Sequence, residues 1–232
     1  MRLSVGTSGF SYVEWRGSFY PEGLPERQML ASYASRLPTV ELNNTFYRMP
    51  RPELIDGWAK NVPDGFTFAP KAPRRITHSQ KLENSADDTK YFLDTVGRFG
   101  TKLGPALFQL PPFLKKDVAR LRDFLAVLPE GTRAAFEFRH ASWFDDEVYA
   151  ALSDKKAALC GAEVDPGDGS GAPLMRTAPY GYIRLRRTEY DAAALGAVLE
   201  KLQSLGFDEC FVYFKHEVLG PSYALEMMKR AA

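Results

Sequence analysis

Apolar and polar residues alternate in eight short stretches of the chain, and patterns of helical spacing separate most of them. In the stretch 133–143, Phe136 and Phe138 fall on one face of an extended strand, whereas Glu137 and Arg139 fall on the other. Two phenylalanines can pack against helices, but a carboxylate and a guanidinium are costly to bury unless they are paired. We therefore predict that this strand carries a charged pair on the face turned away from its helices.

The same reading along the chain predicts an alternation of strands and helices. Strands are predicted at 3–8, 39–46, 66–71, 105–110, from 133 onward, and at 157–164, 181–186 and 209–215. Helices are predicted at 25–36, from 52, at 87–99, 117–128, 145–152 and 191–205, and from 221. The segment 166–173 is rich in proline and glycine, so the sixth helix is reduced to a loop, and whether this loop is a mobile lid is left open.

This alternation determines the predicted fold class. Eight strand–helix units in 232 residues predict an α/β fold, a single (β/α)8 TIM-type barrel domain that spans residues 1–232. An open doubly wound sheet is the alternative. It is disfavoured because Gly6-Thr-Ser-Gly9 is a turn at a strand end and does not match the G-x-G-x-x-G fingerprint.

Composition and charge narrow the classes of function. Thirty basic and 29 acidic residues give a net charge of +1, without the excess that general nucleic-acid binders usually carry. Cys160 and Cys210 sit in apolar strand patterns, which predicts buried thiols in a reducing compartment. No apolar run approaches the ~20 residues of a membrane span, and no apolar signal region begins the chain. We therefore expect a cytoplasmic protein that does not associate with membranes.

Several specific motifs follow one another in order along the chain. They are Val5-Gly-Thr-Ser-Gly-Phe-Ser-Tyr12 with Trp15, Phe19-Tyr-Pro21, Val40-Glu-Leu-Asn-Asn-Thr-Phe-Tyr-Arg48, Lys71-Ala-Pro73 with Thr77-His78, Leu107-Phe-Gln-Leu-Pro-Pro112, and Glu137-Phe-Arg-His140 with Trp143. This set resembles the YecE-like family, the domain-of-unknown-function family numbered seventy-two, over nearly the whole chain. The resemblance implies a barrel of the triosephosphate-isomerase kind and no established reaction. The fold is also similar to the barrels of metal-dependent endonuclease IV and xylose isomerase, by analogy alone.

The chain departs from the pattern of that family at two strand ends. Many members have Arg-Leu-His-Gly at the seventh strand, where this chain has Arg184-Leu-Arg-Arg187. Many have Tyr-Phe-Asn-Asn at the eighth strand, where this chain has Tyr213-Phe-Lys-His-Glu217. Both departures add positive charge, and any role of the replaced His and Asn side chains is in doubt here.

Polar residues fall on the predicted inward faces near the C-terminal strand ends, where barrel enzymes form their sites. These residues are Ser8, Glu41, Asn43, Lys71, Gln109, Glu137, Arg139, Asp165, Arg184, Arg186 and Lys215. The cations among them outnumber the carboxylates. This excess favours an anionic ligand, whether phosphate, carboxylate or a nucleotide backbone.

Four of these residues are candidates for catalysis. Glu41 and Glu137 can act as general acid and base if Lys71 and Arg139 separate their pKa values. Lys71 can also form a Schiff base, although the neighbouring carboxylates would keep its amine charged. The alternative to a site is a lattice of internal salt bridges that fills a polar barrel.

Loop residues at the same end extend the candidate site. The aromatic residues of these loops are Tyr12, Trp15, Phe46, Tyr47 and Trp143. Their rings can stack on a base or a sugar, or they can instead plug the mouth of the barrel. A divalent metal site is conceivable on His78, His140 and His216 with Asp165 or Glu217, although the surrounding cations would oppose the binding of a metal ion. We assign no metal ligand and predict no specific cofactor, and we leave open whether a divalent metal binds.

The hypothesis that follows is an enzyme of the hydrolase or lyase type, acting on an anionic substrate that can carry phosphate. One alternative is a non-catalytic protein that binds nucleotide or nucleic acid with the same cations. Another is a metal-dependent endonuclease-like barrel or a carbohydrate-active barrel, for which the separation of Glu41 and Glu137 is the test. The oligomeric state is left open.

Overall fold

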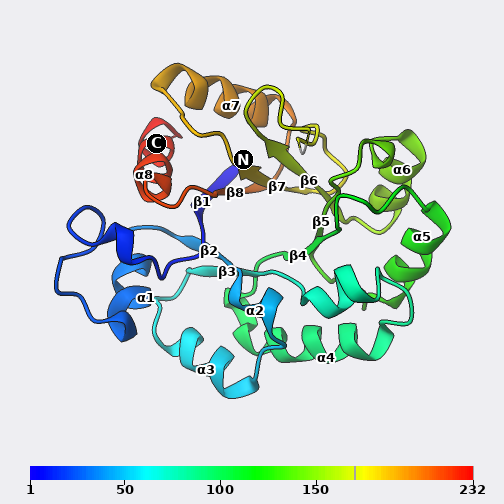
Figure 1. The fold of residues 1–232 in the computed structure, drawn as a ribbon, viewed down its shortest axis with the longest axis horizontal. Helices are drawn as coiled ribbons and strands as arrows, with labels where there is room; N and C mark the ends of the chain where they lie inside the picture. Colours follow the sequence, from blue (N-terminus) through cyan, green and yellow to red (C-terminus); the bar gives the residue numbers. More distant parts are fainter. Residues whose placement is uncertain (170, 232) are drawn as a thin grey trace.

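The structure, a computed structural model, describes residues 1–169 and 171–231, and these form a nearly closed barrel of eight parallel strands (Figure 1). The strands are Arg2–Ser8 (β1), Thr39–Leu42 (β2), Thr67–Pro70 (β3), Ala106–Gln109 (β4), Ala134–Glu137 (β5), Ala158–Glu163 (β6), Tyr180–Leu185 (β7) and Glu209–Phe214 (β8). Helices follow most of the strands and lie around the outside of the ring. The prediction of a (β/α)8 TIM-type barrel is confirmed.

The helices differ in length and in how they begin. They are Glu26–Ala34 (α1), Asn44–Tyr47 (α2), Pro52–Lys60 (α3), Ala86–Val96 (α4), Val118–Val127 (α5), Asp146–Asp154 (α6), Ala192–Ser204 (α7) and Gly220–Ala231 (α8). Shorter helical turns are Val13–Trp15 (η1), the π-helical Arg75–Ser79 (η2), Gly97–Lys102 (η3) and Ala141–Trp143 (η4). Asp117, Asp145 and Asp191 each accept a hydrogen bond from the backbone N–H of the first turn that follows, as N-caps do.

The barrel closes between β3 and β4. The strand order is β3-β2-β1-β8-β7-β6-β5-β4, and isolated bridges join Phe68 to Leu103 and Lys71 to Leu107 across the remaining gap. The backbone N–H of Ala72 donates to the carbonyl oxygen of Leu107 at 2.8 Å. Lys71 therefore lies at the seam of the barrel, one residue past the end of β3.

Large apolar residues fill two separate regions. Between the strands and the helices, Phe108, Phe124 and Phe136 pack with ring centroids 5.2 to 6.1 Å apart. Inside the barrel a second cluster includes Tyr182 and Tyr213. This division is the one that strand alternation predicts, because successive side chains of a strand point to opposite faces.

One strand boundary predicted from the sequence is wrong. The second strand ends at Leu42, whereas 39–46 was expected, and the chain turns into the short helix α2. The cause is Thr45, whose hydroxyl donates to the carbonyl oxygens of Leu42 at 3.0 Å and Lys71 at 2.6 Å. These bonds within and between loops replace the strand ladder that the alternation suggested.

The connection from β6 to β7 holds no helix in its described residues, as the breaker-rich sequence predicts. Its described part forms an antiparallel bridge between Ala162 and Ala172. Ser170, in the middle of the predicted loop 166–173, lies outside the described residues. The suggestion of a lid there is therefore not tested.

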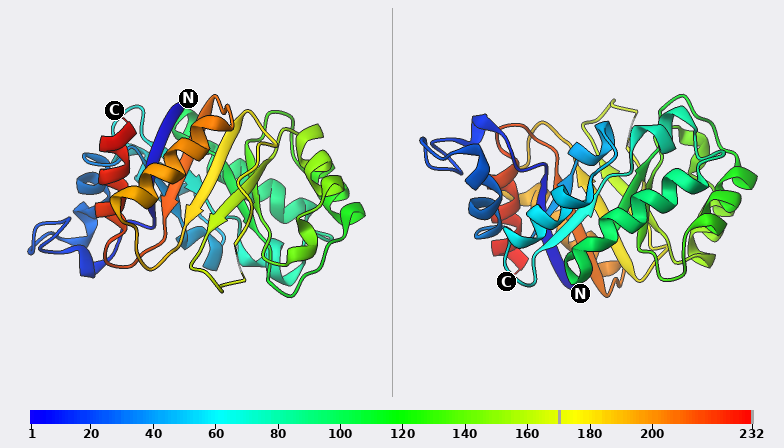
Figure 2. Two further views of the ribbon diagram at one scale, coloured as in Figure 1. Left: turned by 90° about the horizontal axis from the view of Figure 1, so that it is seen from above. Right: turned by 90° about the horizontal axis from the view of Figure 1, so that it is seen from below.

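The two ends of the chain meet on one side of the molecule (Figure 2). Strand β1 pairs in parallel with β8, and α8 lies against β1. Trp15 ties the two ends further, since its indole Nε1 donates to the carbonyl oxygen of Glu217 at 2.7 Å. Within the described residues, none of the helices has the length and apolar character needed to cross a membrane.

Candidate functional site

Arg184, near the end of β7, occupies the buried centre of the site. Its Nη1 donates to Glu137 Oε2 at 2.6 Å, and its Nη2 donates to Glu41 Oε1 at 2.9 Å. All three side chains are almost wholly buried. Strands β2, β5 and β7 thus bring together three residues that the sequence places on inward faces.

Glu41 is held by further donors from neighbouring strands. The Tyr182 hydroxyl donates to Glu41 Oε2 at 2.8 Å, and the Ser8 hydroxyl donates to Glu41 Oε1. Asn43 Nδ2 donates to the Ser8 hydroxyl oxygen at 2.8 Å. The predicted site did not include Tyr182, although it lies two residues before Arg184 and therefore on the same face of β7.

Glu137 is surrounded by arginines. Arg139 Nε donates to Glu137 Oε1 at 3.0 Å, and Arg186 Nη2 lies 4.0 Å from the same oxygen. Burial alone would raise the pKa of Glu137, but Arg184, Arg139 and Arg186, together with Lys71, hold it well below its usual value. Glu137 is therefore a fixed negative charge at neutral pH and has no proton to give as a general acid.

Lys71 has a different environment from the arginines. Its Nζ donates to Gln109 Oε1 at 2.7 Å and lies 4.1 Å from the centroid of the Phe46 ring. Burial first, and then the charge of Arg184 with a contribution from Arg139, lowers the pKa of Lys71 to about 8, although Glu41 and Glu137 oppose this shift. The amine is therefore much more readily deprotonated than that of an ordinary lysine.

Arg139, Arg186 and Lys215 form the outer edge of the site, and we call them the cationic rim. The side chains of Arg139 and Arg186 are 21% and 10% exposed, so both reach the surface of the mouth. Partial burial and the charges of Arg184, Arg139 and Arg186 lower the pKa of Lys215, and Glu137 opposes them. The positive charges of the cationic rim and of Arg184 therefore repel one another.

The three histidines lie at this end of the barrel, and each is engaged by loop residues. His78 Nδ1 lies 2.9 Å from the Thr77 hydroxyl, and His140 Nδ1 lies 2.8 Å from the Ser142 hydroxyl. His216 Nδ1 accepts from the backbone N–H of Leu219 at 2.9 Å. Among the described residues, no group of three or more His, Cys, Asp or Glu side chains is placed to hold a metal ion.

Asp165 lies apart from the buried charges. Its Oδ2 accepts from the backbone N–H and the hydroxyl of Thr188 at 3.0 and 2.6 Å. His216 Nε2 lies 3.1 Å from the carbonyl oxygen of the same Thr188. The two predicted ligand-binding residues therefore fasten the loop after β7, and in this arrangement they do not join the centre of the site.

Two of the aromatic residues predicted to contact a ligand are buried in this structure. Trp15 and Trp143 are wholly buried, and Trp143 Nε1 donates to the carbonyl oxygen of Leu114 at 2.7 Å. Trp143 stacks on Phe138 with centroids 4.4 Å apart. Both indoles pack the loops onto the barrel, because burying a large aromatic side chain in the core stabilises the fold more than exposing it at the mouth would. Tyr47 on α2 is 82% exposed.

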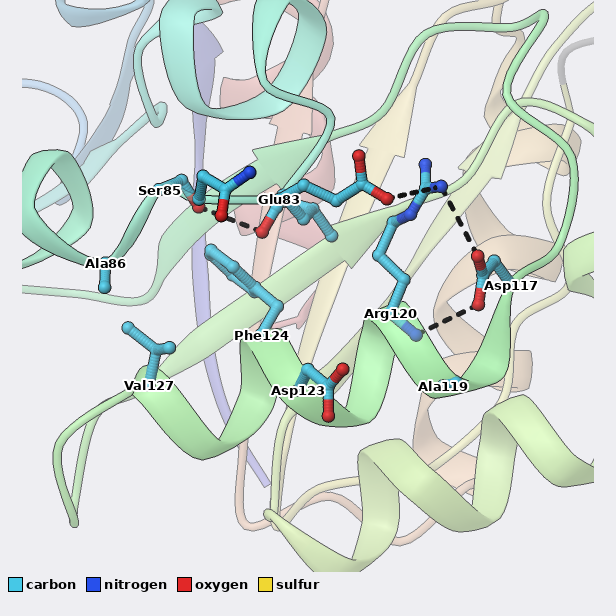
Figure 3. Close-up of a pocket in the computed structure, with 11 residues that line it drawn as sticks. Glu83, Ser85, Ala86, Asp117, Ala119, Arg120, Asp123, Phe124 and Val127 are labelled. Carbon is cyan, nitrogen blue, oxygen red and sulfur yellow. Dashed lines mark hydrogen bonds and ion pairs between the residues drawn. The ribbon is translucent and has the colours of Figure 1, made fainter.

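A groove on the outside of the barrel, between α5 and the segment before α4, is a second concave region (Figure 3). Arg120 Nη2 lies 2.8 Å from Glu83 Oε1 and 3.4 Å from Asp117 Oδ2. Phe124 lines the same groove. The guanidinium is thus already paired with two carboxylates, so this groove lacks the positive excess of the mouth.

Comparison with known families identifies the family of this chain. The profile of the family described as "Protein of unknown function DUF72" matches residues 4–232. The chain belongs to the DUF72 family. This DUF72 protein is 32% identical to the UPF0759 protein YunF of Bacillus subtilis (strain 168) over 192 residues, which cover 75% of the chain and 65% of the relative. It is also 32% identical to the UPF0759 protein YecE of Escherichia coli (strain K12) over 116 residues, 50% of the chain and 43% of the relative.

The chain spans less than two thirds of both curated relatives in these matches. A solved structure is similar over the whole length. A DUF72 family protein from Thermotoga maritima MSB8 superposes with a TM-score of 0.89 at 25% identity, covering 100% of this chain and 99% of the other. The two DUF72 proteins therefore share the barrel, and the description of the family names no activity.

Proposed function

We propose that this DUF72 protein is an enzyme of the hydrolase or lyase type, and that its substrate carries a phosphate or carboxylate group bound at the C-terminal mouth of the barrel. The observation that carries this proposal is the convergence of Arg184, Arg139 and Arg186 on Glu137, with guanidinium nitrogens 2.6, 3.0 and 4.0 Å from its carboxylate oxygens. Like charges held together without enough counter-charge are relieved by an anion.

The charge balance of the mouth supports the same proposal. Among the described residues there, the carboxylates of Glu41 and Glu137 face more cations than they can neutralise. Without counting Arg186, which has a further partner, the cations are Lys71, Arg139, Arg184 and Lys215. The whole chain carries only +1, so the positive excess is local to this end. Such a site attracts an anion without making the protein a general polyanion binder.

Lys71 supports an enzyme over a passive binding protein. A lysine that only holds an anion gains nothing from a lowered pKa, because its charge is what binds. Lys71 is 93% shielded from solvent, against an amide and an aromatic ring, and part of its population is an uncharged amine near neutral pH. An amine of this kind suits a general base or a nucleophile.

Binding of inorganic phosphate, measured by isothermal titration calorimetry, tests the anion site. We expect saturable binding that weakens about tenfold or more in Arg186→Gln and in Lys215→Met, since each removes a charge-assisted contact worth about 1.5–3 kcal/mol. Lys115→Met, which removes an exposed lysine of the loop after β4 that is not part of the cationic rim, is the matched control and should bind as the wild type does. Equal affinity in all four proteins would refute the proposed site.

A screen for turnover tests the claim of catalysis. Phosphate monoesters and small carboxylates that displace bound phosphate are incubated with the wild type and with Lys71→Met, and products are followed by mass spectrometry. We expect turnover of one compound class by the wild type and a loss of about 100-fold or more in the variant. Tight binding without turnover in every class would make the protein a binder.

Nucleotide binding is the second candidate function, and exposed Tyr47 is the observation that favours it. This ring lies on α2 next to Phe46, whose own ring meets Lys71. A base stacked on Tyr47 would place its phosphate near the mouth. Binding of a single-stranded oligonucleotide that falls steeply with salt, and falls again in Tyr47→Ala, would favour this function over the first.

We propose a cytoplasmic location as well. Cys160 and Cys210 are both free and buried, and burial raises the pKa of each thiol. Buried thiols without a disulfide suit a reducing compartment. Fractionation of cells that express a tagged chain tests this location.

A further inference from the structure

We infer that Lys71 is the nucleophile of this site and that the substrate is a carbonyl compound with an anionic group close to the carbonyl, as in a 2-oxo acid. The amine would form an imine with the carbonyl carbon. This inference rests on the proposed function, because the anionic group is the one bound by the cationic rim.

The position of Lys71 sets it apart from the other cations. Arg184 takes up the carboxylates of both Glu41 and Glu137, and Arg139 adds a second bond to Glu137. Within the described residues, no carboxylate oxygen lies at ion-pair distance from Lys71 Nζ, whose hydrogen-bond partner is the neutral amide of Gln109. From sequence alone, the carboxylates are expected to keep this amine charged. The structure instead shows them bound by guanidinium groups.

The electrostatic surroundings act in the same direction. The charged groups that face Lys71 are Glu41 on β2, Glu137 on β5, Arg139 after β5 and Arg184 on β7. Burial and the arginines outweigh the carboxylates and lower the pKa of Lys71 to about 8. At pH 7 about a tenth of Lys71 would be neutral, roughly 250-fold more than for a lysine with the usual pKa of ~10.4. The neutral amine is the form that attacks a carbonyl.

Gln109 connects the amine to the rim. Its Oε1 accepts from Lys71 Nζ at 2.7 Å and from Arg139 Nη2 at 3.2 Å. The amine and a guanidinium of the rim therefore touch the same oxygen atom. A substrate whose carbonyl carbon meets Lys71 would then place a carboxylate one bond away within reach of Arg139. This spacing favours a 2-oxo acid or a similarly short anionic carbonyl compound.

The reaction balances without a cofactor or an oxidant. The neutral Lys71 Nζ adds to the carbonyl carbon, and its N–H proton moves to the carbonyl oxygen to give a carbinolamine. A second proton transfer from nitrogen to the hydroxyl lets water leave with the C–O electron pair, so amine and carbonyl become imine and water. Solvent then protonates the imine to an iminium, which accepts the electron pair of a bond to the α-carbon: either the α-proton leaves to solvent, or an α C–C bond breaks and the other fragment leaves as a carbonyl compound. The enamine that results is protonated at carbon by solvent, and water adds to the restored iminium and releases the lysine amine and the 2-oxo acid.

His78 lies beside the aromatic side chain that covers the amine. Its ring lies edge-on to Phe46 with centroids 5.1 Å apart, on the same aromatic side chain that covers Lys71 Nζ. Burial first, followed by the charges of Lys71, Arg74 and Arg139, lowers the pKa of His78 to about 4, and Glu137 opposes them. The imidazole is therefore neutral at pH 7 and adds no further positive charge beside Lys71.

Reductive trapping tests the inference with two small aldehydes. Glyoxylate carries a carboxylate next to the aldehyde, and glycolaldehyde is the neutral counterpart of similar size. The wild type, Lys71→Met and the control Lys115→Met are each treated with one aldehyde and borohydride, digested and mapped by tandem mass spectrometry. Reduction leaves on the labelled lysine the mass of the aldehyde less one oxygen atom.

We expect glyoxylate to label Lys71 at least about tenfold faster than any exposed lysine at pH 7, and glycolaldehyde to label it more slowly. The rate at Lys71 should rise with pH and level off above pH 8, because the amine is then mostly neutral. Lys115→Met should still be labelled at Lys71. Because the label is mapped on the wild type itself, the result does not depend on the folding of Lys71→Met.

The outcomes separate this inference from the proposed function. No excess labelling of Lys71 while phosphate binds at the rim would overturn the nucleophile and leave the anion site intact. Equally fast labelling by both aldehydes would support the nucleophile and contradict the role of the rim in binding the anion. Fast labelling of exposed lysines with Lys71 untouched would refute the nucleophile, since an accessible amine of lowered pKa should react first.

Discussion

At the scale of single residues, Arg184 determines what the two buried glutamates can do. Its guanidinium lies between Glu41 and Glu137, so the space between the two carboxylates is filled by protein. A glycosidase needs that space for a sugar and a water molecule. The arrangement therefore disfavours the interpretation as a carbohydrate-active enzyme. The two glutamates instead hold the arginine side chains in place.

The ionised state of Glu137 leads to a prediction about stability. We expect Glu137→Gln to lower the free energy of unfolding at pH 7 by about 3–5 kcal/mol, because Arg184 and Arg139 lose the buried charge that both contact. Urea denaturation followed by circular dichroism measures this change. Glu200→Gln, at an exposed position on α7, is the control and should alter stability by less than about 0.5 kcal/mol.

The pH dependence of the same pair of proteins checks the cause. The native pKa of Glu137 is lowered, so its contribution is fully present above the usual carboxyl pKa of ~4.3 and is lost as pH falls through the native value. The gap between wild type and Glu137→Gln should therefore stay constant from about pH 7 to 5 and narrow below about pH 4. A gap that narrows between pH 7 and 5 would point to another titrating group.

The sequence predicts which residues meet at the centre of the site, but not which of them can transfer a proton. Glu41, Glu137 and Arg184 can be placed on inward faces because strand alternation leaves them no other side once the apolar residues face the helices. Whether Glu137 can give up a proton depends on Arg139, Arg184 and Arg186 in three dimensions. No periodicity carries that information, which is why the sequence favours an acid–base pair that the charges oppose.

At the scale of elements, the short helix α2 has more effect on the site than its length suggests. It replaces the predicted second half of a strand and turns Phe46 over Lys71. The bonds of Thr45 to two loop carbonyls decide this turn. Alternation extends the strand through Phe46 because four residues are too few to show helical spacing, so this element could not be read from the pattern.

The closeness of β1 to β2 leads to a second prediction. A Cβ atom added at Gly6 would lie 2.0 Å from the carbonyl oxygen of Thr39, an atom of the neighbouring backbone that cannot move away alone. We expect Gly6→Ala to destabilise the protein by about 3 kcal/mol or more, because the strands must separate or shift. Thermal unfolding followed by circular dichroism measures the effect.

Gly57 provides the matched control for that substitution. It lies within α3, and a Cβ atom added there would meet nothing within 4 Å. Gly57→Ala should stabilise the protein by about 0.5–1 kcal/mol, as a helix-interior glycine does when replaced. If Gly6→Ala were as stable as Gly57→Ala, the backbones of β1 and β2 could not be as close as described.

At the scale of the whole molecule, the closed barrel brings the first and the last strand of the chain side by side. Strand β1 pairs with β2 on one side and with β8 on the other, and α8 covers it. The mouth therefore draws Ser8 from the first strand and Lys215 from the end of the last. A site with this origin needs the complete ring, and no half of the chain contains it.

This dependence leads to the last prediction, that the chain unfolds as one unit. Trp15 follows β1 and Trp143 follows β5, on opposite sides of the eight-stranded ring, and both are buried. If the barrel is a single cooperative domain, tryptophan fluorescence and far-UV circular dichroism should give the same urea midpoint. Trp58→Phe removes the partly buried indole on α3 and should leave that agreement unchanged, since the remaining signals come from the two sides of the ring. Two separated midpoints would show that one side opens before the other, and the mouth, which is built from both, would then be lost at the first transition.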